Sequence, residues 1–422
     1  AGLKKEGVWA AALCLLPGGN WYFWQTLYGG YYLPYIYISL FTMGLAILFV
    51  KNRKTRKGKI DFILLLLLGI GSGLNGVKQL MVFYAPFVLA TAFVFLCDVR
   101  ENYREKQLHR AFFARESFGY LVAALIGTVG SVFGYVINSK VLSKIYHFRD
   151  YNTTKILPNS FLFLMKQYIW SFGYVDGKVL LSGPGIASMC GLMFGLLVIF
   201  CGVRMLFHFA RLTMREKLVF VTAIVSIIFN IFVLSVLDAE GDIQYLQPIV
   251  PMGILLVVLE IKSEDFIFDM SRLAAANIVV LVLAVAALGT ICAEDDDNAW
   301  PYHAYRAEPS LFVTVNALRE MGYTQGIGDF WLANLITELS DGEIEMWSVQ
   351  DGWKSEYYAW LQKQDHIENE PQGRFFLVLR INGNIAVECH LIPRKAVVCD
   401  ATENKNSCTV LMEHIATSAR NR

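Results

Sequence analysis

The chain has 422 residues, of which 55% are apolar and only 17% are charged, and its mean hydropathy is +0.44. Soluble domains carry about 25% charged residues, so this composition excludes a wholly soluble protein. The 37 basic and 36 acidic residues leave a formal net charge of +1, which excludes a global basic field able to attract nucleic acid. The eight cysteines form neither CxxC pairs nor Cys/His clusters, which argues against a thiolate metal site.

Eight apolar runs follow one another in the first 292 residues, and crossing a hydrocarbon core of about 30 Å takes roughly 17 to 25 residues. They cover residues 31–50, 60–74, 80–97, 118–138, 183–207, 218–237, 245–258 with the following turn, and 274–292. The second and the seventh run are short. The pattern predicts an α-helical polytopic membrane protein with about eight transmembrane helices, which occupy a domain of residues 1–292.

Basic residues indicate which connections face the cytoplasm. The connection 51–59 contains six Lys and Arg residues and no acid, which is a strong cytoplasmic signal. Alternation then places the further connections 98–117, 208–217 and 259–273 on the same side. Two connections fit this assignment of sides less well. The cytoplasmic connection 259–273 is mildly acidic, and the external loop 139–182 contains several basic residues.

Both termini are expected outside the cell. Residues 8–17 form an apolar run of only ten residues without a signal-peptide layout, and the chain begins with Ala. We therefore expect upstream sequence with at least one more transmembrane helix.

Residues 293–422 have the composition of a globular domain. The stretch 321–349 predicts a strand, a helix with Asp329 near its start, a Ser-Asp-Gly turn and a second strand, and hence a parallel strand pair. A helix is expected over 355–363 and a buried strand at RFFLVL, residues 374–379. We expect a small extracytoplasmic α/β domain, in which two of Cys389, Cys399 and Cys408 could pair.

The external loop 139–182 contains an aromatic segment, FLFLMKQYIWSF, that is too short to span a membrane. It is interpreted either as a helix in the membrane interface or as a plug packed on the bundle. In the first case the loop is a platform for a lipid substrate, with Lys140, Lys144 and Arg149 attracting a phosphate.

The hairpin GIGSGLNGVKQLMVFYAP reverses direction between the second and third runs. It places Asn75, Lys78 and Gln79 at or just below the outer membrane surface. A Lys at bilayer depth costs roughly 2.5 to 3.5 kcal/mol, so such a residue usually faces a cavity or a counter-charge. The alternative is that Lys78 extends to water.

Three carboxylates, Asp238, Glu240 and Asp242, lie in another tight external turn. They could bind a divalent cation or serve as a base, or the turn could simply be solvated. No HExxH motif, Walker loop or Rossmann fingerprint is present, so ATP-driven transport is not expected.

Several segments resemble integral-membrane glycosyltransferases of the GT-C type, in particular bacterial relatives of the protein mannosyltransferases. They are the hairpin GIGSGLNGVKQLMVFYAPFVLA, the sequence DIQYLQPIVPMGILLVV, and GIGDFWLANLITELSDGEIEMWSV with its downstream YYAWLQK and RFFLVL. The resemblance implies a polyprenyl-phosphate-linked sugar donor that is bound from the outer leaflet. It also implies transfer to a glycan or protein acceptor outside the cytoplasm.

The same resemblance assigns roles to individual residues. The family's catalytic carboxylate usually lies in the first external loop, but residues 1–30 contain only Glu6, so the catalytic residue is expected upstream of Ala1. Lys78 corresponds to the family's positively charged residue, and Gln244 stands where an Arg commonly precedes the equivalent of Tyr245. The expected substrate-binding residues are Asn75, Lys78, Gln79, Arg149, Asp242, Gln244 and Tyr245, with no protein-held metal assigned.

The sequence leaves three functions open. The first is a GT-C glycosyltransferase that needs no certain cofactor, a divalent metal ion being possible, and whose partners are membrane lipid, donor and acceptor but not nucleic acid. The second is a transporter or flippase for lipid-linked saccharides, which would need buried charges along a pathway or internal repeats. The third is a non-catalytic receptor with an external ligand-binding domain.

Overall fold

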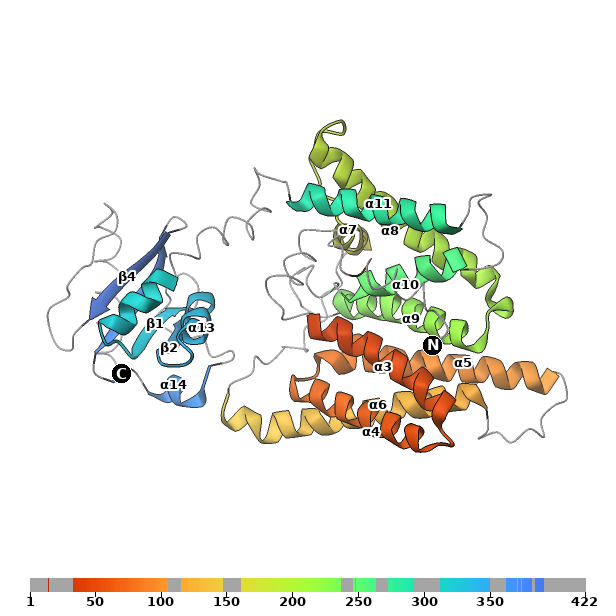
Figure 1. The fold of residues 1–422 in the computed structure, drawn as a ribbon, viewed down its shortest axis with the longest axis horizontal. Coiled ribbons are helices and arrows are strands. Elements are labelled where there is room, and N and C mark those ends of the chain that lie inside the picture. Colours follow the sequence, from red (N-terminus) through yellow and green to blue (C-terminus); the bar gives the residue numbers. More distant parts are fainter. Residues whose placement is uncertain are drawn as a thin grey trace. The chain divides into compact units, whose positions relative to one another are not determined.

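The computed structural model divides the chain into two compact units (Figure 1). The first unit comprises Ala1–Ser139 and Asn152–Pro301, and the second comprises Lys140–Tyr151 and Tyr302–Arg422. The structure describes residues 14, 33–104, 115–146, 161–236, 246, 248–262, 272–291, 312–349, 362–369, 371–372, 374–381 and 384–390.

The first unit is helical. Its elements are α3 (Leu33–Asn52), α4 (Arg56–Leu74), the π-helix η2 (Leu80–Tyr84), α5 (Ala85–Arg104), α6 (Glu116–Lys140), α7 (Phe161–Ser171), α8 (Gly183–Phe207), α9 (Met214–Val236), α10 (Ile249–Lys262) and α11 (Arg272–Ile291). Helix α9 contacts α5 and α10, and α8 contacts α10 and α11, so α9 and α10 connect the two sides of the bundle. A helix therefore occurs at each of the eight apolar runs in the sequence.

Four stretches of the described chain are long and apolar enough to cross a membrane: Pro34–Asn52, Leu80–Glu101, Glu116–Lys144 and Gly183–Phe207. By contrast, α10 has 14 residues and rises only about 21 Å at 1.5 Å per residue. Helix α4 begins with the charged sequence RKGKID, which shortens its apolar part. The structure therefore supports a membrane protein, while the count of eight spans stays a prediction.

Ion pairs collect at one end of the bundle, where α5, α8 and α10 end and α6 and α9 begin. The pairs are Arg115–Asp98 (3.6 Å), Lys217–Glu101 (3.2 Å), Arg215–Glu116 (3.4 Å), Lys262–Glu216 (2.7 Å) and Arg204–Glu260. The connection 51–59 lies at the same end, because Nη1 of Arg53 donates to the carbonyl of Arg115 at 3.1 Å. Residues from all four connections that the sequence assigns to the cytoplasm therefore meet at this end, which we call the charged end.

One acid of the mildly acidic connection 259–273 belongs to the charged end. Glu260 is buried and pairs with Arg204, which comes from the end of a different helix. The acid therefore neutralises a basic residue that is remote in the sequence, and it does not argue against the common location of these connections.

Helices α4 and α6 pack backbone against backbone. A Cβ atom on Gly73 would lie 2.0 Å from the carbonyl oxygen of Ser131, and one on Gly134 would lie 2.1 Å from the carbonyl oxygen of Ile70. Apolar helices gain no hydrophobic free energy by leaving lipid, so small residues that allow close contact stabilise such pairs. This contact fixes the end of α4, where the hairpin begins.

The second unit contains a four-stranded sheet in the order β2-β1-β3-β4. Its elements are β1 (Gln325–Asp329), α13 (Phe330–Leu339), β2 (Glu345–Val349), α14 (Gln364–Glu368), β3 (Phe375–Ile381) and β4 (Asn384–His390). Strand β1 is parallel to β2 and β3, whereas β4 is antiparallel to β3. This confirms the predicted parallel pair.

The turn after α13 also follows the prediction, because Asp341 and Gly342 adopt φ of 54° and 79°. Leu332 and Ile336 of α13 and Val315 and Leu318 of the helical residues 312–320 pack on one face of the sheet. Of the helix expected over 355–363, only Gln362 and Lys363 are described, and they precede α14.

On the opposite face of the sheet, the ring of His366 stacks on Trp347 with the centroids 4.0 Å apart. Glu345 forms ion pairs with Lys363 and His366, and the hydrogen bond from Lys363 holds the pKa of this carboxylate below its usual value. The backbone N–H of Gln364 donates to the carbonyl of Ile145 at 2.9 Å. Through this bond the residues that follow α6 join the second unit, although the sequence assigned them to a loop of the membrane domain.

Candidate functional site

The hairpin between α4 and η2 lies at the end of α4 remote from the charged end. Asn75 follows the last residue of α4, and its N–H donates to the carbonyl of Ser72 at 3.3 Å. Gly76 adopts a φ of +95°, a conformation that L side chains rarely adopt, and this reverses the chain before Lys78. The structure therefore places Asn75, Lys78 and Gln79 in one chain reversal, while their depth in the membrane stays a prediction.

Gln79 is buried, with 1% of its surface exposed. Its Nε2 donates to the carbonyl oxygen of Tyr35 at 3.3 Å and to Oγ of Ser39 at 3.0 Å. Because a carbonyl oxygen only accepts, the atom that faces Tyr35 must be the amide nitrogen. No described residue donates to the remaining Oε1. A buried acceptor without a donor costs about 1 to 3 kcal/mol, so this position favours a bound hydroxyl or water.

Asn75 and Lys78 extend the polar surface around Gln79. Nδ2 of Asn75 donates to the hydroxyl of Tyr35 at 3.3 Å, while the side chain itself is exposed, and Lys78 is half-buried. Nδ2 of Asn138 donates to the carbonyl of Leu74 at 2.7 Å. The hairpin therefore lies against the end of α6, directly before loop 139–182.

A π-helical turn, η2, follows the hairpin directly. Wide turns of this kind occur frequently at functional sites, because they redirect backbone groups. Nδ2 of Asn230 in α9 donates to the carbonyl of Val82 within this turn at 3.0 Å. The hydroxyl of Tyr84 lies 3.5 Å from Oγ1 of Thr42. Polar side chains thus continue from Gln79 into the bundle, between α3 and α9.

Helix α7 packs on the bundle through those side chains of the segment FLFLMKQYIWSF that are described. Tyr168 and Phe172 are 3% and 1% exposed, and the hydroxyl of Tyr168 donates to the carbonyl of Gly195 in α8 at 3.0 Å. Lys166 is exposed and pairs with Asp176 at 2.5 Å. The described part of the segment therefore agrees with a plug packed on the bundle, while its position relative to the membrane interface stays a prediction.

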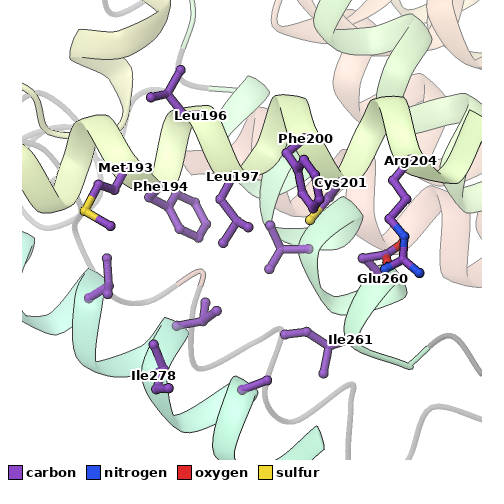
Figure 2. A pocket seen from close by; sticks show the side chains of 14 residues that line it. Met193, Phe194, Leu196, Leu197, Phe200, Cys201, Arg204, Glu260, Ile261 and Ile278 are labelled. Carbon is purple, nitrogen blue, oxygen red and sulfur yellow. The ribbon is translucent and has the colours of Figure 1, made fainter. Parts of the chain in front are cut away.

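An apolar cavity of about 650 Å³ lies between α8, α10 and α11 (Figure 2). Met193, Leu196 and Phe200 of α8 line one side, and Ile278 of α11 lines another. The ion pair between Arg204 and Glu260 closes one end. In a membrane, such a lining favours hydrocarbon chains over water.

The other expected site residues lie outside the described part of the chain. These are Arg149, Asp242, Gln244 and Tyr245, together with Asp238 and Glu240. Among the described residues, no group of three His, Cys, Asp or Glu side chains could hold a metal ion. Cys389 lies in β4, whereas Cys399 and Cys408 are not described, so their pairing stays an expectation.

No family model, curated protein or solved structure matches the chain.

Sequence reasoning missed Tyr35, Ser39 and Asn230, which provide the partners of the hairpin and of η2. A signal for all three exists in the sequence. Tyr35, Ser39 and Thr42 are spaced by four and three residues, and therefore share one face of an apolar helix. Asn230 belongs to a similar pattern, because Thr222, Ser226 and Asn230 are spaced by four residues and share one face of another apolar helix.

Proposed function

We propose that the chain is a polytopic membrane glycosyltransferase of the GT-C type with eight spans. It takes a sugar from a polyprenyl-phosphate donor and transfers it to a glycan or protein acceptor on the extracytoplasmic side, where the second unit also lies. The observation that carries the proposal is the hairpin Asn75–Gln79. It combines a cation with a buried acceptor to which no described residue donates, opposite the charged end of an apolar bundle.

Each residue of the hairpin fits a part of the donor. The ammonium group of Lys78 provides a charge for the phosphate, and charge-assisted contacts of this kind contribute about 1.5 to 3 kcal/mol. Oε1 of Gln79 accepts a hydrogen bond from a sugar hydroxyl. Asn75 and the hydroxyl of Tyr35 offer further polar contacts beside them. The polyprenyl chain stays in the lipid that surrounds the apolar helices.

The reaction is a displacement at the anomeric carbon. The acceptor oxygen attacks this carbon while a carboxylate takes the hydroxyl proton, and the bond to the phosphate oxygen breaks with its electron pair. The leaving group is polyprenyl phosphate, whose charge Lys78 stabilises. The carboxylate is expected in the family's first external loop. A divalent ion near Asp238, Glu240 and Asp242 would add to the stabilisation of the phosphate.

The change Lys78→Gln tests the phosphate contact. It keeps much of the side-chain length and removes the charge, so donor affinity is expected to fall roughly 10- to 150-fold, each 1.4 kcal/mol being tenfold. Lys78→Arg is expected to retain most of the binding. The measurement is binding of a polyprenyl-phosphate sugar to the full chain in nanodiscs.

Equal affinities for wild type, Lys78→Gln and Lys78→Arg would contradict the contact between Lys78 and the phosphate. They would favour the alternative that Lys78 extends to water. Donor binding without sugar transfer to any acceptor would favour the flippase or the receptor.

A further inference from the structure

Residues 51–59, at the end of α3 and the start of α4, contain a group of exposed basic residues, and we call this segment the basic loop. The group consists of Lys51, Lys54, Arg56, Lys57 and Lys59. None of the five forms an ion pair within the described part of the chain. The acid nearest in sequence, Asp61, is buried and accepts a hydrogen bond from Nδ2 of Asn52 at 3.0 Å.

Five other basic residues at the charged end are neutralised. Arg115, Arg204, Arg215, Lys217 and Lys262 each have a carboxylate partner. These five residues stabilise contacts between helices, and carboxylates of the protein neutralise their charges. The charge of the basic loop is directed outward instead, and it needs counter-charges that the described residues do not provide.

An apolar strip adjoins the basic loop on the next turns of α4. It consists of Ile60, Phe62, Ile63, Leu64 and Leu67, which are 42% to 57% exposed. In a membrane this strip faces acyl chains, so the ammonium and guanidinium groups at its end lie at head-group level. The partner must therefore combine a hydrocarbon part with a negative head group.

We propose that the basic loop and the apolar strip form a binding surface for anionic phospholipids of the leaflet at the charged end. The head groups lie against the basic side chains, and the acyl chains lie along α4. Nucleic acid and soluble polyanions match the charge but leave the apolar strip without a partner. The proposal is independent of the proposed function, because it concerns the end of the bundle opposite the hairpin.

The test compares phosphatidylglycerol with phosphatidylcholine. Native mass spectrometry of the full chain in detergent, titrated with each lipid, gives the affinity. Wild type is expected to bind phosphatidylglycerol more tightly than phosphatidylcholine, and the preference is expected to shrink as salt is raised. Lys54→Gln/Lys57→Gln is expected to weaken phosphatidylglycerol binding roughly 25-fold, since each charge near an anionic surface contributes about fivefold.

Two variants serve as controls. Lys54→Arg/Lys57→Arg keeps the charge and is expected to keep the affinity. Lys363→Gln/Arg374→Gln removes two exposed charges of the second unit and is expected to change the affinity less than threefold. An equal loss in Lys54→Gln/Lys57→Gln and Lys363→Gln/Arg374→Gln would overturn the proposal, and so would an unchanged affinity in both.

A final arm separates lipid from free phosphate. Millimolar inorganic phosphate or glycerol phosphate is expected to displace little phosphatidylglycerol, because neither occupies the apolar strip. Displacement by either at such concentrations would show a site for soluble phosphate, and would contradict a lipid surface.

Discussion

The change Glu260→Gln is expected to lower the free energy of unfolding by about 3 to 5 kcal/mol. The side chains of Arg204 and Glu260 are 11% and 5% exposed, so both charges are largely withdrawn from water. Gln keeps the shape of Glu but not its charge, which leaves the guanidinium group buried without a counter-charge. Reversible unfolding of the full chain in mixed micelles measures the effect.

The double variant Arg204→Met/Glu260→Met is the control for the ion pair. Replacing both partners with apolar residues of similar volume removes the unpaired charge, and such replacements are often neutral or stabilising. The double variant is therefore expected to unfold close to wild type. A Glu260→Gln variant as stable as wild type would show that water solvates the pair, and would contradict its burial.

The change Gly73→Leu is expected to lower the free energy of unfolding by about 3 kcal/mol or more. A Cβ atom at this position would lie 2.0 Å from the backbone oxygen of Ser131, and backbone cannot move aside as the end of a side chain can. Helices α4 and α6 must separate, which also displaces the hairpin. We therefore expect a lower free energy of unfolding in mixed micelles and a lower affinity for the donor in nanodiscs.

Gly71→Leu is the matched control, because Gly71 lies on the same helix only two residues away. It is exposed, and a Cβ atom there would meet nothing within 4 Å. Both substitutions gain helix propensity over Gly by a similar amount, of up to about 1 kcal/mol. A similar loss in the two variants would refute the close contact of α4 with α6.

The helices of the first unit could be predicted because long apolar runs depend only on local composition. The boundaries agree closely at α8, predicted over 183–207 and observed at Gly183–Phe207. The same holds in the second unit, where the turn residues Asp341 and Gly342 mark the end of α13. These features depend on residues that are consecutive in the chain, so they can be predicted from the sequence without knowledge of the fold.

The partners of the site residues could not be predicted in the same way. Gln79 bonds to Tyr35 and Ser39, more than 35 residues earlier, and only the packing of α3 against the hairpin brings them together. The π-helix η2 has no signal in the sequence LMVFY, which suits an ordinary helix. Likewise, the bond from Gln364 to Ile145 joins segments whose proximity depends on the whole fold.

Sidedness is the claim on which the proposed function depends most directly, since the hairpin must face the compartment of the donor and the acceptor. Thr55→Cys in the basic loop and Glu320→Cys in the second unit both place an exposed thiol. A membrane-impermeant maleimide, applied to intact cells and compared with the parent chain, is expected to label Glu320→Cys alone. Thr55→Cys is expected to react only after the cells are opened. Labelling of Thr55→Cys in intact cells, with Glu320→Cys protected, would contradict the account.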